Sequence, residues 1–97
     1  ALSSAASDVY KRQVIARGRG IELNTGGFHY GLGEPNPCRA VIRRYRELGG
    51  EIITVGADAH GPEKIAYDFD KAAAILADCG FKYYTVFQNR KPEFVKL

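Results

Sequence analysis

The sequence lacks the features that mark a membrane or secreted protein. No stretch approaches the roughly 18 consecutive apolar residues that a membrane-spanning helix needs. No charged and then apolar leader ending in small residues is visible either. We therefore expect a soluble cytoplasmic protein that has no membrane partner.

Cysteine is scarce, and its spacing excludes the common cysteine motifs. Cys38 and Cys79 form no Cys-x-x-Cys pair and have no histidine at metal-finger distance. Each falls in a segment that predicts a helix. We expect two packed thiols in a reducing compartment.

A strong excess of charge is also absent, since the formal net charge is +3. The densest basic group consists of Arg39, Arg43, Arg44 and Arg46, on one predicted helix. A solvated helix face explains this group more simply than a nucleic-acid surface does. We expect no nucleic-acid partner.

The chain is short, and its first residues differ from the rest. With 97 residues, it has room for one core and no second domain. Residues 1–13 lack the apolar periodicity of the remaining chain, and they resemble translated adapter sequence at the ends of some environmental gene fragments. We interpret 1–13 as a non-native leader and 14–97 as the folded portion. The alternative is a genuine N-terminal helix.

From residue 21 onward, the pattern predicts alternating strands and helices. Strands are predicted at 21–24, 51–56 and 81–87, with a short terminal strand at 94–97. The first helix is predicted from Pro37, capped by Asn36, to about Leu48. The second is predicted from about Asp68 to Asp78.

Each predicted helix has one apolar stripe and a glycine at its end. The two stripes consist of Val41, Tyr45 and Leu48 in the first helix, and of Phe69, Ala72, Ala73 and Leu76 in the second. Gly49 and Gly80 can adopt the left-handed conformation that ends a helix. Both helices are therefore expected to pack on a sheet.

The order of the predicted elements indicates the fold class. Strand, helix, strand, helix, strand gives two crossover units, which predicts a parallel sheet and an α/β fold. The nearly continuous apolar run at 51–56 is typical of a strand covered on both faces. Because three strands leave sheet edges unpaired, we interpret the chain as part of a larger α/β domain.

Polar residues follow each predicted strand of this sheet. Functional groups of α/β folds gather at the carboxyl ends of their strands. The first strand ends at Asn24, the second runs into Asp58 and His60, and the third ends near Arg90. A purely structural strand end requires no such side chains.

Asp58 and His60 form the sharpest of these groups. Residues two apart in an extended segment point to the same side, and carboxylate with imidazole is a common ligand set for divalent metals. Gly56 and Gly61 permit close approach of the backbone. The alternative is that Asp58 caps a turn and His60 forms a hydrogen bond in a loop.

The first strand offers further candidates. Glu22 and Asn24 share one face, and a carboxylate facing a barrel interior is costly unless it is paired or hydrated. The alternative is an edge strand with Glu22 in solvent. His29 could reach the same pocket from the following loop, and an ordinary loop histidine explains it equally well.

Several segments then occur in a recognisable order. They are Ile-Glu-Leu-Asn-Thr-Gly-Gly-Phe at 21–28, Asn36-Pro37, Ile-Thr-Val-Gly-Ala-Asp-Ala-His at 53–60, Cys-Gly-Phe at 79–81, and 87–92. Together they resemble the closing third of histidinol phosphatases of the PHP family, over about residues 15–97. The resemblance implies the C-terminal part of a distorted (β/α)7 barrel, with parallel strands and crossover helices. It also implies that the N-terminal part of the same domain is a missing partner.

The resemblance implies a metal-dependent phosphoesterase that hydrolyses histidinol phosphate in histidine biosynthesis. Asp58 and His60 would be catalytic as ligands of divalent ions such as zinc, manganese or iron, which acidify bound water and neutralise phosphoryl charge. Asn24, His29 and Arg90 would bind the small phosphate monoester, with His29 where family members often carry arginine.

Other functions remain open at this point. The PHP domain could belong to another phosphatase, or to a DNA polymerase in which it acts as an exonuclease or a structural module. The further ligands of the family, including an N-terminal His-x-His, have no counterpart in this sequence. We therefore expect the chain to be inactive by itself.

Overall fold

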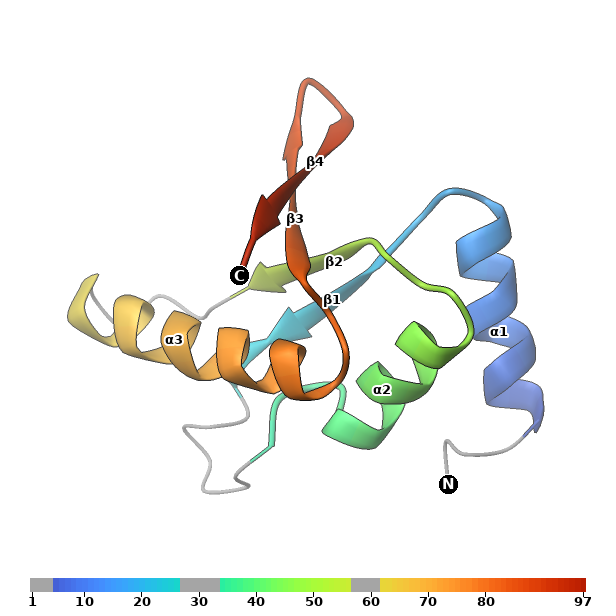
Figure 1. Cartoon of the computed structure of the whole chain (residues 1–97), viewed down its shortest axis with the longest axis horizontal. Coiled ribbons are helices and arrows are strands. Elements are labelled where there is room, and N and C mark those ends of the chain that lie inside the picture. The colour runs from blue at the N-terminus through green and yellow to red at the C-terminus, as the bar shows by residue number, and fades with distance from the viewer. Residues whose placement is uncertain (1–4, 27–33, 57–61) are drawn as a thin grey trace.

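The computed structural model describes residues 5–26, 34–56 and 62–97, which form three helices and four strands (Figure 1). In chain order, these elements are α1 (Ala5–Ala16), β1 (Ile21–Asn24), α2 (Arg39–Glu47), β2 (Ile53–Gly56), α3 (Pro62–Asp78), β3 (Tyr83–Gln88) and β4 (Lys91–Lys96).

The first crossover unit is formed as predicted. Strands β1 and β2 pair in parallel, in a register that places Ile21 opposite Ile53 and Asn24 opposite Gly56. Helix α2 lies between them in the chain. The α/β class, with a parallel sheet and helices, is thereby confirmed.

The predicted second crossover unit is wrong for the described residues. Strand β3 pairs with β4 in an antiparallel hairpin and joins no ladder with β2. The two-residue turn between them consists of Asn89 and Arg90, which have φ values of 51° and 65°. Two left-handed residues in succession produce the tight reversal of a hairpin, so the terminal strand pairs locally.

The predicted start of α2 is also wrong. Asn36 does not cap the helix, whose N-cap position is Cys38; its backbone instead exchanges two hydrogen bonds with that of Asn24, at 3.0 and 2.9 Å. The helix begins at Arg39, after an exposed Cys38, so the packed-thiol prediction fails for Cys38 and is confirmed for the buried Cys79.

The predicted helix ends are confirmed. Gly49 and Gly80 have φ values of 101° and 99°, and each follows the last turn of its helix. Helix α3 begins at Pro62, earlier than the predicted residue 68. Within the described residues, no helix combines the length and apolar character needed to cross a membrane.

The core lies between the parallel strands and helices α2 and α3. Its buried members are Leu23, Ile42, Tyr45, Ile53, Ala72, Ile75, Leu76, Cys79 and Phe81. The α2 stripe is shifted from the prediction, since Ile42 is fully buried whereas Val41 and Leu48 are half-buried. Tyr45 donates a hydrogen bond to the Ile52 carbonyl at 2.8 Å, and burial raises the pKa of its phenol.

The structure gives residues 5–16 the conformation of a helix, α1, which lies beside α2. The Arg44 guanidinium donates to both carboxylate oxygens of Asp8, with the shortest distance 2.8 Å. This hydrogen bonding lowers the pKa of Asp8. The non-native origin of residues 1–13 stays a prediction, because a helical conformation says nothing of where the sequence came from.

Candidate functional site

The two parallel strands end level with each other. Asn24 is the last residue of β1, and it lies opposite Gly56, the last residue of β2. The segments that follow both strands therefore start from one edge of the sheet, called here the carboxyl edge. The site predicted from the sequence depends on this arrangement, because the prediction assumes that the carboxyl ends of the strands lie at one edge.

Three of the predicted site residues lie outside the described residues. They are Asp58 and His60, which follow β2, and His29, which follows β1. Their roles stay predictions. The structure does place Asn24 and Arg90, and it also places Glu22.

The side chain of Asn24 is held in a local turn at the carboxyl edge. Its Oδ1 atom accepts a hydrogen bond from the backbone N–H of Gly26 at 2.7 Å. Asparagine often forms such a turn two residues back from the donor. Together with the backbone pairing to Asn36, this bond orients the half-buried amide of Asn24.

Glu22 approaches the carboxyl edge more closely than its sequence position indicates. A Cβ atom placed on Gly56 would lie 2.7 Å from both Cδ and Oε1 of Glu22, so the carboxylate leans over this glycine. Glu22 is nevertheless exposed, as the edge-strand alternative expected. The register of β1 and β2 creates this contact, and the sequence pattern alone did not indicate it.

Thr25 is a further polar residue at the edge, which the sequence places at the end of the first strand but which was not predicted as a site residue. It is fully buried directly after β1, and its Oγ1 atom has no hydrogen-bond partner among the described residues. Buried hydroxyl groups without a partner are uncommon in folded proteins. Its position beside Asn24 is the one signal that could have drawn attention to it.

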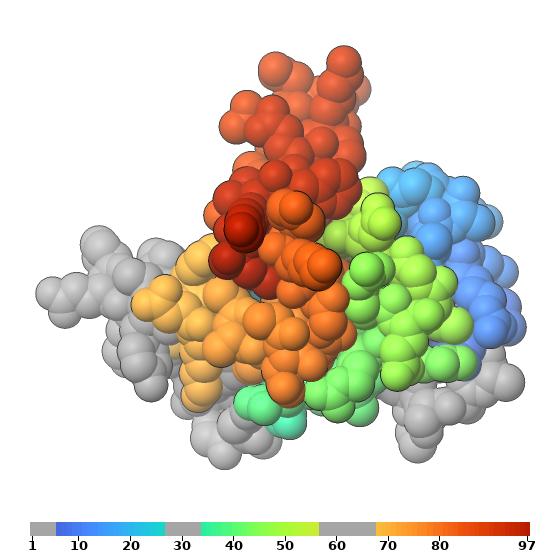
Figure 2. All heavy atoms as spheres, in the orientation of Figure 1, coloured from blue at the N-terminus to red at the C-terminus, as the bar shows by residue number. Residues whose placement is uncertain are grey.

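The structure does not bring Arg90 to the carboxyl edge. Arg90 is exposed in the turn of the β3–β4 hairpin, which projects from the rest of the molecule (Figures 1 and 2). The predicted parallel third strand would have ended beside β2. The antiparallel hairpin carries the arginine away instead.

The described residues do not form a metal centre by themselves. Among them, no three or more histidine, cysteine, aspartate or glutamate side chains gather in one place. At the carboxyl edge, the described part of the chain contributes the carboxylate of Glu22. A metal site there would need donors from outside the described residues.

Parallel strands with polar groups at their carboxyl edge are the arrangement from which α/β enzymes build their sites. Three curated proteins match this chain, each named "Probable histidinol-phosphatase". The chain is 31% identical to the Thermotoga maritima protein over 84 residues, which is 87% of this chain and 35% of that protein.

The other two matches are similarly distant. The Clostridium acetobutylicum protein is 36% identical over 65 residues, covering 64% of this chain and 24% of that protein. The Deinococcus radiodurans protein is 30% identical over 78 residues, covering 80% and 29%. No protein-family model matches the chain. The resemblance to histidinol phosphatases is confirmed, and the chain spans about a third or less of these relatives' length.

Proposed function

We propose that this chain is the C-terminal part of a PHP-family enzyme, a metal-dependent phosphoesterase that hydrolyses histidinol phosphate in histidine biosynthesis. The match to three proteins named as histidinol phosphatases carries the proposal. Because the chain spans 35% or less of each, the activity belongs to a longer protein of which the chain is a part. The (β/α)7 barrel is the fold proposed for that protein.

The level ends of β1 and β2 support the location of the active site. Asp58 follows Gly56 by two residues, so covalent geometry keeps its Cα within about 7.6 Å of the Gly56 Cα. Gly56 in turn lies opposite Asn24. Asp58 is thus tied to the carboxyl edge by chain length alone.

The donor set of this edge suits a divalent metal. Asp58 and His60 offer the carboxylate and imidazole ligands that zinc, manganese and iron accept. The negative charge of Glu22 beside Gly56 favours a cation nearby. When bound, such an ion would polarise the phosphoryl group and acidify water.

The remaining groups of the edge would orient the substrate. Asn24 has its amide already positioned by Gly26 and Asn36, so it is the first candidate to line the phosphate pocket. His29 belongs to the segment after the same strand and is the second. Arg90 is the weakest candidate, because the hairpin holds it away from the edge.

The isolated chain is expected to have little or no activity. Two predicted ligands cannot hold a multinuclear cluster, and the described residues add no group of three or more potential ligands. The further ligands must come from the rest of the longer protein.

The proposal is tested in a full-length enzyme that carries this chain, by comparing Asp58→Asn with Asp78→Asn. Asp78 is a matched control, because it is an exposed aspartate paired with Arg43 at 3.1 Å on the far end of α3. Bound metal, by elemental analysis, and histidinol phosphate hydrolysis should both fall at least about tenfold in Asp58→Asn, since even the partners of metal ligands carry such effects. Asp78→Asn should change neither.

Two results would contradict this proposal. Unchanged metal content and rate in Asp58→Asn would remove the site assignment. A wild-type protein that binds metal but does not hydrolyse histidinol phosphate would remove the substrate.

A further inference from the structure

One face of the β3–β4 hairpin carries exposed aromatic side chains. Side chains alternate between the faces of a strand pair, and the register places Thr85 opposite Phe94 and Phe87 opposite Pro92. Tyr83, Phe87 and Phe94 are 47%, 49% and 48% exposed on this shared face. The aromatic face is defined here as Tyr83, Phe87, Pro92 and Phe94.

The opposite face of the hairpin is anchored at one residue. There, Tyr84 packs edge-on against Phe69 of α3, with ring centroids 5.1 Å apart. On the aromatic face itself, between Tyr83 and Phe87 and opposite Phe94, Thr85 is buried and its Oγ1 accepts a hydrogen bond from Ile53 N at 3.1 Å. The hairpin is therefore anchored through one residue on each face, while Tyr83, Phe87 and Phe94 stay about half-exposed.

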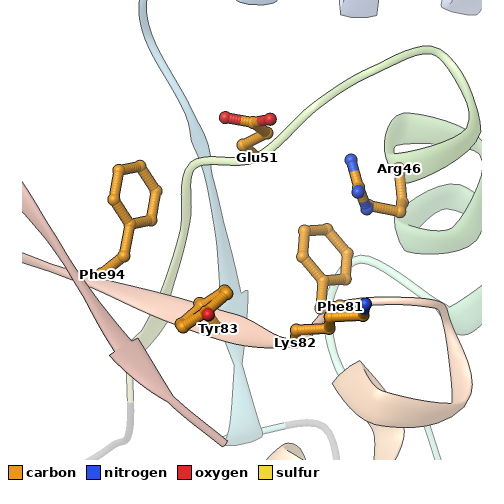
Figure 3. A pocket seen from close by; sticks show the side chains of 6 residues that line it. All are labelled: Arg46, Glu51, Phe81, Lys82, Tyr83 and Phe94. Atoms are coloured by element: carbon orange, nitrogen blue, oxygen red, sulfur yellow. The ribbon is translucent and has the colours of Figure 1, made fainter.

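A hollow of about 380 Å³ continues the aromatic face toward α2 (Figure 3). Its lining consists of Arg46, Glu51, Phe81, Lys82, Tyr83 and Phe94. The rings of Tyr83, Phe81 and Phe94 surround it, and the charged groups lie around its margin. Such a hollow suits an apolar side chain of a partner. Polar residues beside that side chain would meet the charged groups at the margin.

The outer edge of β4 is poorly suited to pairing with another strand. Leu97 N donates to Lys82 O at 3.0 Å, so the pairs that include Pro92 and Phe94 point their backbone groups outward. Pro92 has no N–H to offer, and lysines stand at both ends of the strand. This edge disfavours a second copy that adds strand to strand, so a partner should cover the aromatic face through side chains.

The relatives indicate what this partner is. This chain accounts for 35%, 24% and 29% of their lengths, so most of each relative has no counterpart here. We propose that the aromatic face and its hollow are the surface on which the remaining part of the parent enzyme packs. The inference rests on the proposed function to the extent that the chain is part of such an enzyme.

The test uses a hybrid in which residues 14–97 replace the matching segment of the Thermotoga maritima protein. Hydroxyl-radical footprinting then compares the oxidation rates of Tyr83, Phe87 and Phe94 in the hybrid with those in the 97-residue chain. Without metal or substrate, these rates should fall about tenfold in the hybrid, because buried interface groups are shielded from solvent.

Phe94→Ser and Val95→Ser provide a matched pair of variants. Val95 is 38% exposed and lies on the opposite face of the same strand. In the hybrid, Phe94→Ser should raise the oxidation of Phe87 toward its value in the isolated chain, and Val95→Ser should leave it within about twofold. Phe87→Ser, read out at Tyr83, gives a second variant if Phe94→Ser does not fold.

Three outcomes would overturn the inference. They are unprotected aromatic residues in the folded hybrid, a wild-type hybrid that cannot fold, and a stable dimer of the 97-residue chain that Phe94→Ser dissociates. The proposed function fails separately, since a protected hybrid that binds no metal and hydrolyses nothing would contradict only the activity.

Discussion

The β1–β2 pair and the β3–β4 hairpin are both made of strand-forming residues, yet they are buried very differently. Leu23 and Ile53 of the parallel pair are fully buried under α2 and α3. Every residue of β4 is exposed, and Phe94 remains half-exposed. Strand formation therefore follows from local sequence, whereas burial depends on whether a covering element is present.

The two regions also differ in the contacts that hold them in the fold. The parallel pair is held by packing around the fully buried Tyr45, whereas the hairpin is held through Thr85 and the contact of Tyr84 with Phe69. Substitutions should therefore be costly in the first region and mild in the second.

The largest effect is expected from Tyr45→Ala compared with Phe87→Ala. The Tyr45 ring is fully buried 6.3 Å from that of Phe81, and its hydroxyl is bonded to Ile52 O. Removing it should lower the free energy of unfolding by about 3–5 kcal/mol. Phe87→Ala, at a half-exposed position, should cost less than about 1 kcal/mol. Urea unfolding followed by circular dichroism measures both, and equal costs would break the comparison.

A smaller effect is expected from Thr85→Val, which tests the attachment of the hairpin. The variant keeps the shape of the side chain but leaves the N–H of Ile53 without its buried acceptor. We expect a loss of about 1–3 kcal/mol in the free energy of unfolding and faster hydrogen exchange at the Ile53 amide. Thr85→Ser, which retains the hydroxyl, should protect that amide better than Thr85→Val. Identical exchange in the two variants would show that the bond does not hold the hairpin.

The smallest effect extends the comparison to α1, which is linked to α2 through the part-buried ion pair of Asp8 and Arg44. Because Arg44 lowers the pKa of Asp8 in the folded state, the pair stabilises the protein above the unfolded carboxyl pKa of about 3.9. This contribution is lost as the pH falls through the lowered pKa. Asp8→Asn should therefore reduce stability slightly near pH 7 and reduce its loss between pH 5 and 3. An unchanged acid profile in thermal unfolding would contradict this role.

Apolar periodicity and helix-ending glycines predicted most of the unit formed by β1, α2, β2 and α3. The apolar run at 51–56, together with Gly49 and Gly80, correctly indicated β2 and the ends of α2 and α3. The cap predicted at Asn36 failed because the helix begins three residues later, at Arg39, while the backbone of Asn36 pairs with Asn24, which lies close only in the folded chain.

The hairpin escaped prediction for a local reason. Its turn, Asn89 and Arg90, contains no glycine, although both residues adopt left-handed conformations. Without the glycine that usually marks such a turn, the sequence pattern of β3 predicts a further parallel strand. The same error placed Arg90 at the carboxyl edge.

The candidate site, too, was predicted from the sequence only in part. Sequence placed Asn24 at the end of the first strand, and the structure agrees. The contact of Glu22 with Gly56 and the buried hydroxyl of Thr25 depend on which strand pairs with which. Strand pairing brings together residues about thirty positions apart in the sequence. A local sequence pattern does not predict which of these residues meet.

By itself, the sequence indicated most of the strands and helices, the α/β class and the resemblance to histidinol phosphatases, because these depend on residue order and local periodicity. Tertiary structure decided the register that sets Glu22 over Gly56, the reversal that removes β3 from the parallel sheet, and the exposure of the aromatic face. Each of these depends on long-range packing, in which free energy is gained only when distant segments meet.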